Sequence, residues 1–97
     1  MELNYDHNRL VEICEKYGVR ELRIFGSFAH GNANQESDVD VLYEFTDSSA
    51  IGIELIDFAD DLEELFHRKV DIVSLKHVPE YLTELMVAPS VQIYDAA

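Results

Sequence analysis

Segments with the hydrophobic pattern of a β-strand alternate with segments patterned as α-helices along this chain, and this order constrains the fold more than any other feature. Residues 38–45 read Asp-Val-Asp-Val-Leu-Tyr-Glu-Phe, an alternating run that predicts a strand. The other predicted strands are 20–25, 69–75 and, as a possible edge strand, 90–94, and the predicted helices are 6–17, about 51–67 and 79–88. Helices interleaved with strands in this way predict an α/β (α+β) fold, with helices packed on a small mixed β-sheet.

The first predicted helix has a defined start, end and apolar face. Asp6 can cap its first turn, and Gly18 can end it in the left-handed conformation that glycine favours. Its apolar side chains recur at helical spacing, at Leu10, Ile13, Cys14 and Tyr17. Cys14 is therefore predicted to be a buried apolar side chain, and we assign it no chemistry.

The second long helix, at about residues 51–67, follows a turn and possible cap at residues 47–49. Its predicted inward stripe consists of Leu55, Phe58, Ala59, Leu62, Leu65 and Phe66. Its other face carries Glu54, Asp57, Asp60, Asp61, Glu63 and Glu64. A solvated surface explains this acidic face most simply, and a docking surface is the alternative. His67 and Arg68 follow the helix, where positive charge is favourable.

Length and charge limit the possible functions. A chain of 97 residues can form one compact domain with a modest core, but not two. Its formal net charge of −13 repels the phosphate backbone of nucleic acid, which argues against nucleic acid as a partner. No apolar run is long enough to span a bilayer, and a single cysteine with no secretory-type N-terminus favours the reducing cytoplasm.

Three aspartates are expected to meet on one face of the sheet. Side chains at positions i and i+2 of a strand point the same way, so Asp38 and Asp40 lie within reach of one ion. Asp71 is central in the strand 69–75, and a neighbouring position of that strand would bring it beside the pair. Three like charges this close repel one another unless a cation offsets them, and oxygen ligands favour Mg²⁺ or Mn²⁺. Such a trio can hold two metal ions about 4 Å apart and catalyse in-line displacement at phosphorus.

A Gly-Ser pair precedes this acidic strand. Gly26 and Ser27 directly follow the strand predicted at residues 20–25. Glycine permits close approach of the backbone, and the amides and hydroxyl of Ser27 at the start of a short helix can receive triphosphate oxygens. Alone, a Gly-Ser turn or an Asp-x-Asp pattern indicates little. Their order, with ten residues between the two motifs and an aspartate in a third strand, indicates nucleotidyl transfer.

At these residues the chain resembles the minimal nucleotidyltransferases of the polymerase β superfamily, whose signature is Gly-Ser, ten residues, then Asp-x-Asp. The resemblance extends through residues 66–73 and, more loosely, to residues 93–94, so it covers nearly the whole chain. It implies a polymerase-β-like fold and a single nucleotidyltransferase domain over residues 1–97.

The resemblance also implies a role for each motif residue. By family analogy Asp38 and Asp40 bind both metal ions, while Asp71 binds the catalytic one and helps to deprotonate the acceptor hydroxyl. Gly26 and Ser27 hold the triphosphate. Many relatives carry Arg or Lys where this chain has His30. His30 is therefore a candidate phosphate contact with a weaker, pH-dependent charge, or else an exposed loop residue.

The partner and reaction are likewise implied by the family. Stand-alone domains of this kind are commonly paired with a helical HEPN-type protein, as antitoxin to a toxin nuclease, and adenylylate a tyrosine of that partner with ATP as donor. The hypothesis is therefore a Mg²⁺-dependent transfer of AMP within a hetero-oligomer, using two ions, with Mn²⁺ as a possible substitute. Two alternatives stay open: a transferase acting on a small-molecule hydroxyl such as that of an aminoglycoside, and a non-catalytic module that neutralises its partner by masking it.

Overall fold

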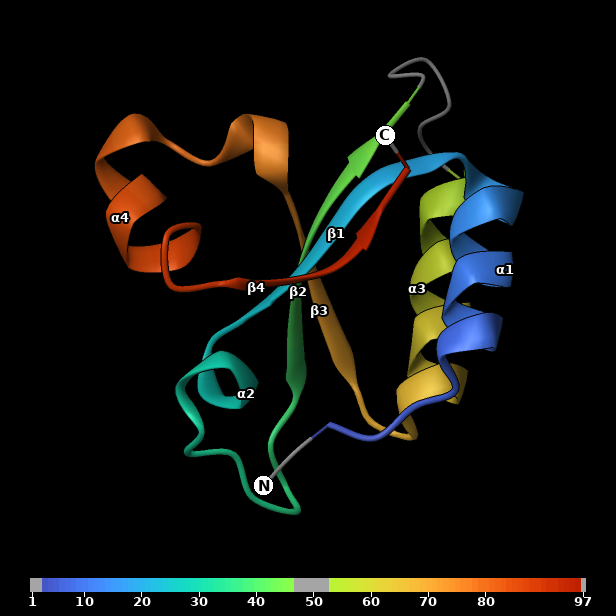
Figure 1. Cartoon of the computed structure of the whole chain (residues 1–97), viewed down its shortest axis with the longest axis horizontal. Coiled ribbons are helices and arrows are strands. Elements are labelled where there is room, and N and C mark those ends of the chain that lie inside the picture. The colour runs from blue at the N-terminus through green and yellow to red at the C-terminus, as the bar shows by residue number, and fades with distance from the viewer. Residues whose placement is uncertain (1–2, 47–52, 97) are drawn as a thin grey trace.

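A four-stranded mixed sheet runs through the middle of the structure (Figure 1), a computed structural model that describes residues 3–46 and 53–96. Its strands, in the spatial order β3-β2-β1-β4, are β1 (Val19–Phe25), β2 (Val39–Phe45), β3 (Val70–Ser74) and β4 (Val91–Asp95). β1 pairs antiparallel with β2 and with β4, whereas β2 pairs parallel with β3. The predicted mixed sheet is confirmed, and each strand begins and ends within one residue of its predicted bounds.

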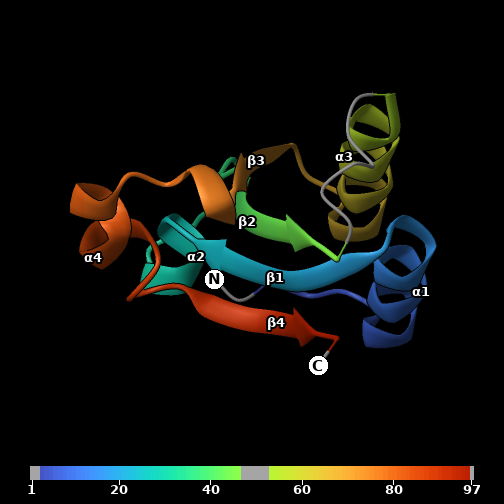
Figure 2. The ribbon, with the colours of Figure 1, turned by 90° about the horizontal axis from the view of Figure 1, so that it is seen from above.

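Two long helices cover one side of this sheet. α1 (His7–Tyr17) and α3 (Ile53–Phe66) lie side by side, and the short α4 (Thr83–Met86) lies on the other side of the strands (Figures 1 and 2). The parallel pairing of β2 with β3 needs a crossover connection, which α3 supplies. No helix in the described part of the chain is long and apolar enough to cross a membrane.

The ends of α1 are those that the sequence predicts. The Asp6 carboxylate accepts hydrogen bonds from the backbone amides of Asn8 at 3.0 Å and Arg9 at 3.4 Å. Gly18 follows the helix with a φ of 70°, and its amide donates to the carbonyl of Cys14. Cys14 itself is fully buried, and this burial raises the pKa of its thiol to about 12. The thiol therefore stays protonated at neutral pH, as expected of a purely structural cysteine.

The core lies between the two long helices and the side of the sheet that faces them. Phe58 of α3 is fully buried, and its ring makes edge contacts with those of Tyr17 and Phe45, each at 5.5 Å between ring centroids. Val39 and Val41 of β2 are also fully buried in this core, as their alternation with Asp38 and Asp40 predicts. The buried members of the predicted stripe of α3 are Phe58, Leu62, Leu65 and Phe66.

The segment before β4 differs from its prediction. The sequence predicts one helix over residues 79–88, whereas the structure has the 3₁₀ turn η2 (Glu80–Leu82) followed by the short α4. A further 3₁₀ turn, η1 (Leu75–His77), follows β3. Proline at position 89 disfavours a helical residue before it, and the exposed Tyr81 and Leu85 leave little apolar burial to hold a longer helix. The turn predicted at residues 47–49 and the helix start predicted at residue 51 lie outside the described residues.

Phe58→Ala should lower the free energy of unfolding by about 3–5 kcal/mol, because it empties a fully buried site among aromatic rings. Ile56→Ala is the matched control on the same helix. Ile56 is 67% exposed, so its truncation should change the stability by no more than about 0.5 kcal/mol. Urea-induced unfolding followed by circular dichroism measures both values, and equal losses would contradict the placement of the core.

Candidate functional site

Two of the three predicted aspartates, Asp40 and Asp71, lie side by side on one face of the sheet, and the charge of Asp38 acts on Asp40. Asp40 of β2 is paired directly with Asp71 of β3 in the parallel ladder, and neighbouring strands are about 4.8 Å apart. Asp38 immediately precedes β2 and is two residues from Asp40, near enough for its charge to act on the Asp40 carboxyl. Asp40 is half-buried, whereas Asp38 and Asp71 are exposed. The strand of Asp71 is thus the neighbour of the Asp38–Asp40 strand, as the sequence predicts.

The negative charges of this group act on one another. The pKa of the Asp40 carboxyl is raised above 3.8, first by its burial and then by the charges of Asp71 and Asp38. The ion pairs found in residues 3–46 and 53–96 engage other carboxylates, those of Glu12, Glu21, Glu44 and Asp61. Burial and like charges alone account for the raised pKa of Asp40. An external cation can offset negative charge of this kind.

The chemistry of the donor set determines which cation fits. In the part of the chain that the structure describes, no three His, Cys, Asp or Glu side chains already converge as metal ligands. The three aspartates form an open acidic group, which does not suit a permanently held structural ion. Mg²⁺ keeps several of its waters and is usually held by one or two carboxylates together with substrate phosphates. The arrangement fits a magnesium ion that arrives with a nucleotide.

A glycine turn lies against the Asp40 carboxylate. β1 ends at Phe25, which is paired with Asp40, and Gly26 follows with φ of 72° and ψ of −144°. A Cβ atom at Gly26 would collide with the carboxylate of Asp40. Only glycine permits both this backbone conformation and this contact. The turn and the acidic group therefore belong to one site, a contact that the sequence pattern alone does not reveal.

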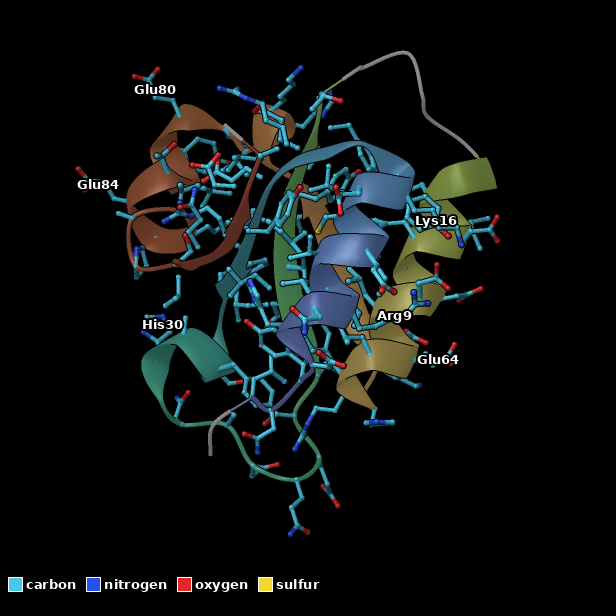
Figure 3. All side chains as sticks on the ribbon, turned by 45° about the vertical axis from the view of Figure 1, so that its right-hand side comes forward. Arg9, Lys16, His30, Glu64, Glu80 and Glu84 are labelled. Atoms are coloured by element: carbon cyan, nitrogen blue, oxygen red, sulfur yellow. The ribbon has the colours of Figure 1, made fainter. Side chains whose placement is uncertain are left out.

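The short helix α2 (Ser27–His30) begins at this turn. Gly26 is its N-cap and makes no side-chain capping bond, and the first amides of a helix lack intrahelical partners. Ser27 is half-buried at the first position of α2, next to Asp40 through Gly26. His30 is exposed at the last position, and Figure 3 shows its side chain outside α2. A phosphate contact for His30 stays a prediction.

Sequence reasoning missed a role for Arg68. The sequence assigns this residue to the end of α3, where its charge is favourable. In the structure its guanidinium instead donates to backbone carbonyls of the loop that leads to Asp38. The residues that meet here are more than 30 positions apart, and no local pattern in the sequence reports such a contact.

Two hollows lie along the acidic face of α3. One of about 500 Å³ is bordered by Lys16, Tyr17, Asp57, Asp60 and Asp61. Asp61 accepts hydrogen bonds from the Tyr17 hydroxyl at 2.7 Å and from Lys16 at 3.2 Å, and these partners hold the pKa of its carboxyl below the usual value. Lys16 and Glu64 lie on this side in Figure 3, away from His30. These acids are exposed or locally paired, so we assign them no part in the site.

The sequence is similar to a known family and to named relatives. It matches the family described as "Polymerase beta, Nucleotidyltransferase" over residues 8–97. A Methanocaldococcus jannaschii protein assigned as a protein adenylyltransferase is 27% identical over 96% of this chain and 99% of that protein. The protein adenylyltransferase MntA of Thermococcus cleftensis is 39% identical over 64% of this chain and 62% of that protein.

Solved structures share the fold. One assigned as a minimal nucleotidyltransferase has a TM-score of 0.73 and 28% identity, over 88% of this chain and 86% of that one. A toxin–antitoxin complex with AMP-PNP gives a TM-score of 0.72 at 19% identity, over 94% of this chain and 74% of that one. A Shewanella oneidensis complex of a tri-AMPylated HEPN toxin with an MNT antitoxin gives a TM-score of 0.63 at 17% identity, over 93% of this chain and 70% of that one.

Gly26→Ala should displace the Asp40 carboxylate and so weaken binding of Mn²⁺ with AMP-PNP, measured by titration calorimetry. Gly31→Ala is the matched control, because Gly31 also has a positive φ, of 79°, but a Cβ there meets nothing within 4 Å. We expect Gly31→Ala to cost about 1 kcal/mol of stability without changing the affinity for Mn²⁺. Gly26→Ala should cost up to about 3 kcal/mol of stability and also weaken the binding of Mn²⁺ with AMP-PNP. Equal affinities in the two variants would contradict the contact.

Asp40→Asn should stabilise the metal-free protein at pH 7. The folded state raises the pKa of this carboxyl, so folding favours its protonated form. In the wild type, the protonated carboxyl stabilises the folded state to the full extent below pH 3.8, and this stabilisation is lost as the pH rises through the raised pKa. The variant's advantage should therefore be present at pH 7 and absent in strong acid. Urea unfolding in EDTA, at pH 7 and in strong acid, measures the difference in the free energy of unfolding between variant and wild type. Asp57→Asn is the control for the loss of one charge.

Proposed function

The chain belongs to the polymerase β nucleotidyltransferase family and is an enzyme of that kind, and we propose that it transfers AMP from ATP to a tyrosine of a HEPN-type toxin, as the antitoxin of the pair. One observation carries the proposal: Asp40, which is paired with Asp71 of the neighbouring strand, lies against a glycine turn that starts a helix. That arrangement joins acceptor oxygens for a cation to amides for phosphate oxygens.

The relatives support the choice of donor and acceptor. Two of them bear the name protein adenylyltransferase. One structural neighbour is a toxin–antitoxin complex with AMP-PNP, an analogue of ATP, and another contains a tri-AMPylated HEPN toxin with its MNT antitoxin. We carry ATP as the donor, the HEPN toxin as the partner and a hetero-oligomer as the working assembly over to this chain. Its net charge of −13 disfavours a polynucleotide as the acceptor.

Each site residue has a place in this proposal. Asp38 and Asp40 would hold two Mg²⁺ ions, or Mn²⁺ in their place, and Asp71 would share the ion at the reacting phosphorus. When bound, these ions offset the charge of the phosphates and carboxylates. The amides of the Gly26–Ser27 turn and the Ser27 hydroxyl would hold the triphosphate. His30 would add positive charge at the rim of the site when it is protonated.

The reaction is an in-line displacement at the α-phosphorus of ATP. The tyrosine oxygen of the toxin attacks that phosphorus and forms a new P–O bond. The bond to the bridging oxygen between the α- and β-phosphates breaks, and pyrophosphate leaves with the electron pair. Asp71 is exposed at the edge of the acidic group, and its carboxylate takes the proton of the tyrosine hydroxyl.

Incubation of the full chain with Mg²⁺, α-labelled ATP and a HEPN toxin should leave label on a toxin tyrosine, located by mass spectrometry. Asp38→Asn combined with Asp40→Asn should abolish the labelling, because both metal-holding carboxylates become neutral amides. Asp57→Asn combined with Asp60→Asn is the matched control. It removes the same charge from the exposed face of α3 and should label at the wild-type rate.

Two outcomes would replace the proposal with another function. If the Asp38→Asn, Asp40→Asn variant still neutralised the toxin, masking rather than transfer would be the function. If the wild type labelled a small-molecule hydroxyl in a substrate panel but never the toxin, the chain would be a small-molecule nucleotidyltransferase. Both readouts use the same preparations.

A further inference from the structure

The loop of residues 31–37 leads from α2 to the strand that carries Asp38 and Asp40. Local hydrogen bonds shape it: the Asn34 amide donates to the Ser37 hydroxyl at 2.8 Å, and the Glu36 amide donates to the Asn34 side chain at 2.8 Å. These bonds join loop residues only to one another, and most of the loop is exposed. They shape the later part of the loop, whereas its start is held to α2 by the bond from the Asn32 amide to the Ser27 carbonyl at 3.1 Å.

Arg68 attaches this loop to the segment between α3 and β3. Its Nη1 atom donates to the carbonyls of Asn34 at 3.0 Å, Gln35 at 3.2 Å and Ser37 at 2.9 Å. The Ser37 carbonyl belongs to the peptide group that joins Ser37 to Asp38. A charged guanidinium is a strong donor to carbonyl oxygens, so the side chain fixes the backbone immediately before Asp38.

The same guanidinium also reaches α2. Its central carbon lies 4.9 Å from the centre of the Phe28 ring, within the range of a cation–π contact. Phe28 directly follows Ser27 in α2. Arg68 is therefore in contact with the helix that begins at the glycine turn as well as with the loop that ends at Asp38.

The backbone next to Arg68 continues into β3. The Val39 amide donates to the Lys69 carbonyl at 2.9 Å, and Asp71 then pairs with Asp40. One side chain thus joins the three segments that carry Ser27, Asp38 and Asp71. A residue that fixes the backbone of metal-holding groups influences the metal and the reaction without touching either.

We propose that Arg68 is a positioning residue, which sets the place of Asp38 relative to Ser27 and Asp71 by holding the loop 31–37 against α2. The inference rests on the proposed assignment of those three residues to the site. It differs from a simple stabilising role, because loss of the contact should free one loop while the core, built on α1, α3 and the sheet, stays intact.

The test compares Arg68→Ala with Arg20→Ala in the full chain. Arg20 is a matched control, since its side chain is 62% exposed and pairs with Glu44 at 3.0 Å, away from the loop. Hydrogen exchange at the amides of residues 31–38 needs neither nucleotide nor toxin. Exchange there should be faster in Arg68→Ala and unchanged in Arg20→Ala, while the amides of α1 and α3 stay as protected as in the wild type.

Kinetics supply the second readout. In the labelling assay with toxin, Arg68→Ala should lower kcat by about 10- to 100-fold and leave KM for the toxin unchanged. The affinity for Mn²⁺ with AMP-PNP, measured by calorimetry, should fall as well. Arg68→Lys keeps the charge but loses the planar guanidinium and its stacking on the Phe28 ring. Its kcat and its affinity for Mn²⁺ with AMP-PNP should therefore lie between those of Arg68→Ala and the wild type.

The outcomes separate the two proposals. Loop exchange and affinity for Mn²⁺ with AMP-PNP as in the wild type would overturn the role of Arg68, as would a freed loop without loss of affinity or kcat. If Arg68→Ala does not fold, Phe28→Leu replaces it in the test, because it removes the cation–π contact and keeps an apolar side chain. Phe28→Leu should speed loop exchange and weaken binding of Mn²⁺ with AMP-PNP, each to a smaller extent. If neither quantity changes in Phe28→Leu, the role of Arg68 is overturned. If the wild type never labels the toxin, the proposed function fails, while exchange and calorimetry still decide the role of Arg68.

Discussion

Electrostatic repulsion among Asp38, Asp40 and Asp71 is the constraint on which the rest of the site depends. Two neighbouring strands hold Asp40 and Asp71 on one face, Asp38 directly precedes the first of them, and the raised pKa of Asp40 reflects both its burial and its two charged neighbours. A loose chain would relieve the repulsion by separating them. The hydrogen-bonded ladder between β2 and β3, backed by the fully buried Val39 and Val41, prevents that separation. The apolar core therefore offsets the unfavourable electrostatic energy of a group of like charges, which the proposed function pairs with a cation.

The sequence predicted the sheet because its signals are local. Val39, Val41 and the intervening aspartates alternate with a period of two, and this period placed both the core side and the acidic side of β2. Asp6 and Gly18 likewise marked the ends of α1 through the hydrogen bonds of nearby residues. The neighbourhood of Asp71 was predictable for a related reason, since a parallel strand joined through a helix tends to lie beside its predecessor.

What the sequence did not predict depends on distant contacts or on weak burial. The contact between Gly26 and the Asp40 carboxylate arises from the pairing of two strands, and the bonds of Arg68 join the end of α3 to a loop far back in the chain. No periodicity records either contact. The prediction of one helix over residues 79–88 was wrong for a different reason. Tyr81 and Leu85 remain exposed, so little apolar burial stabilises a longer helix there.

The parallel pairing of Asp40 with Asp71 links the site to the folding reaction. The intervening chain, which includes α3, must close before the two carboxylates become neighbours, and such non-local pairing forms slowly. An unfolded or half-folded chain consequently does not present this acidic group. A ligand that binds only the completed ladder shifts the equilibrium toward that ladder by mass action. Under the proposed function, the abundance of intact protein should therefore respond to the supply of nucleotide and metal ion.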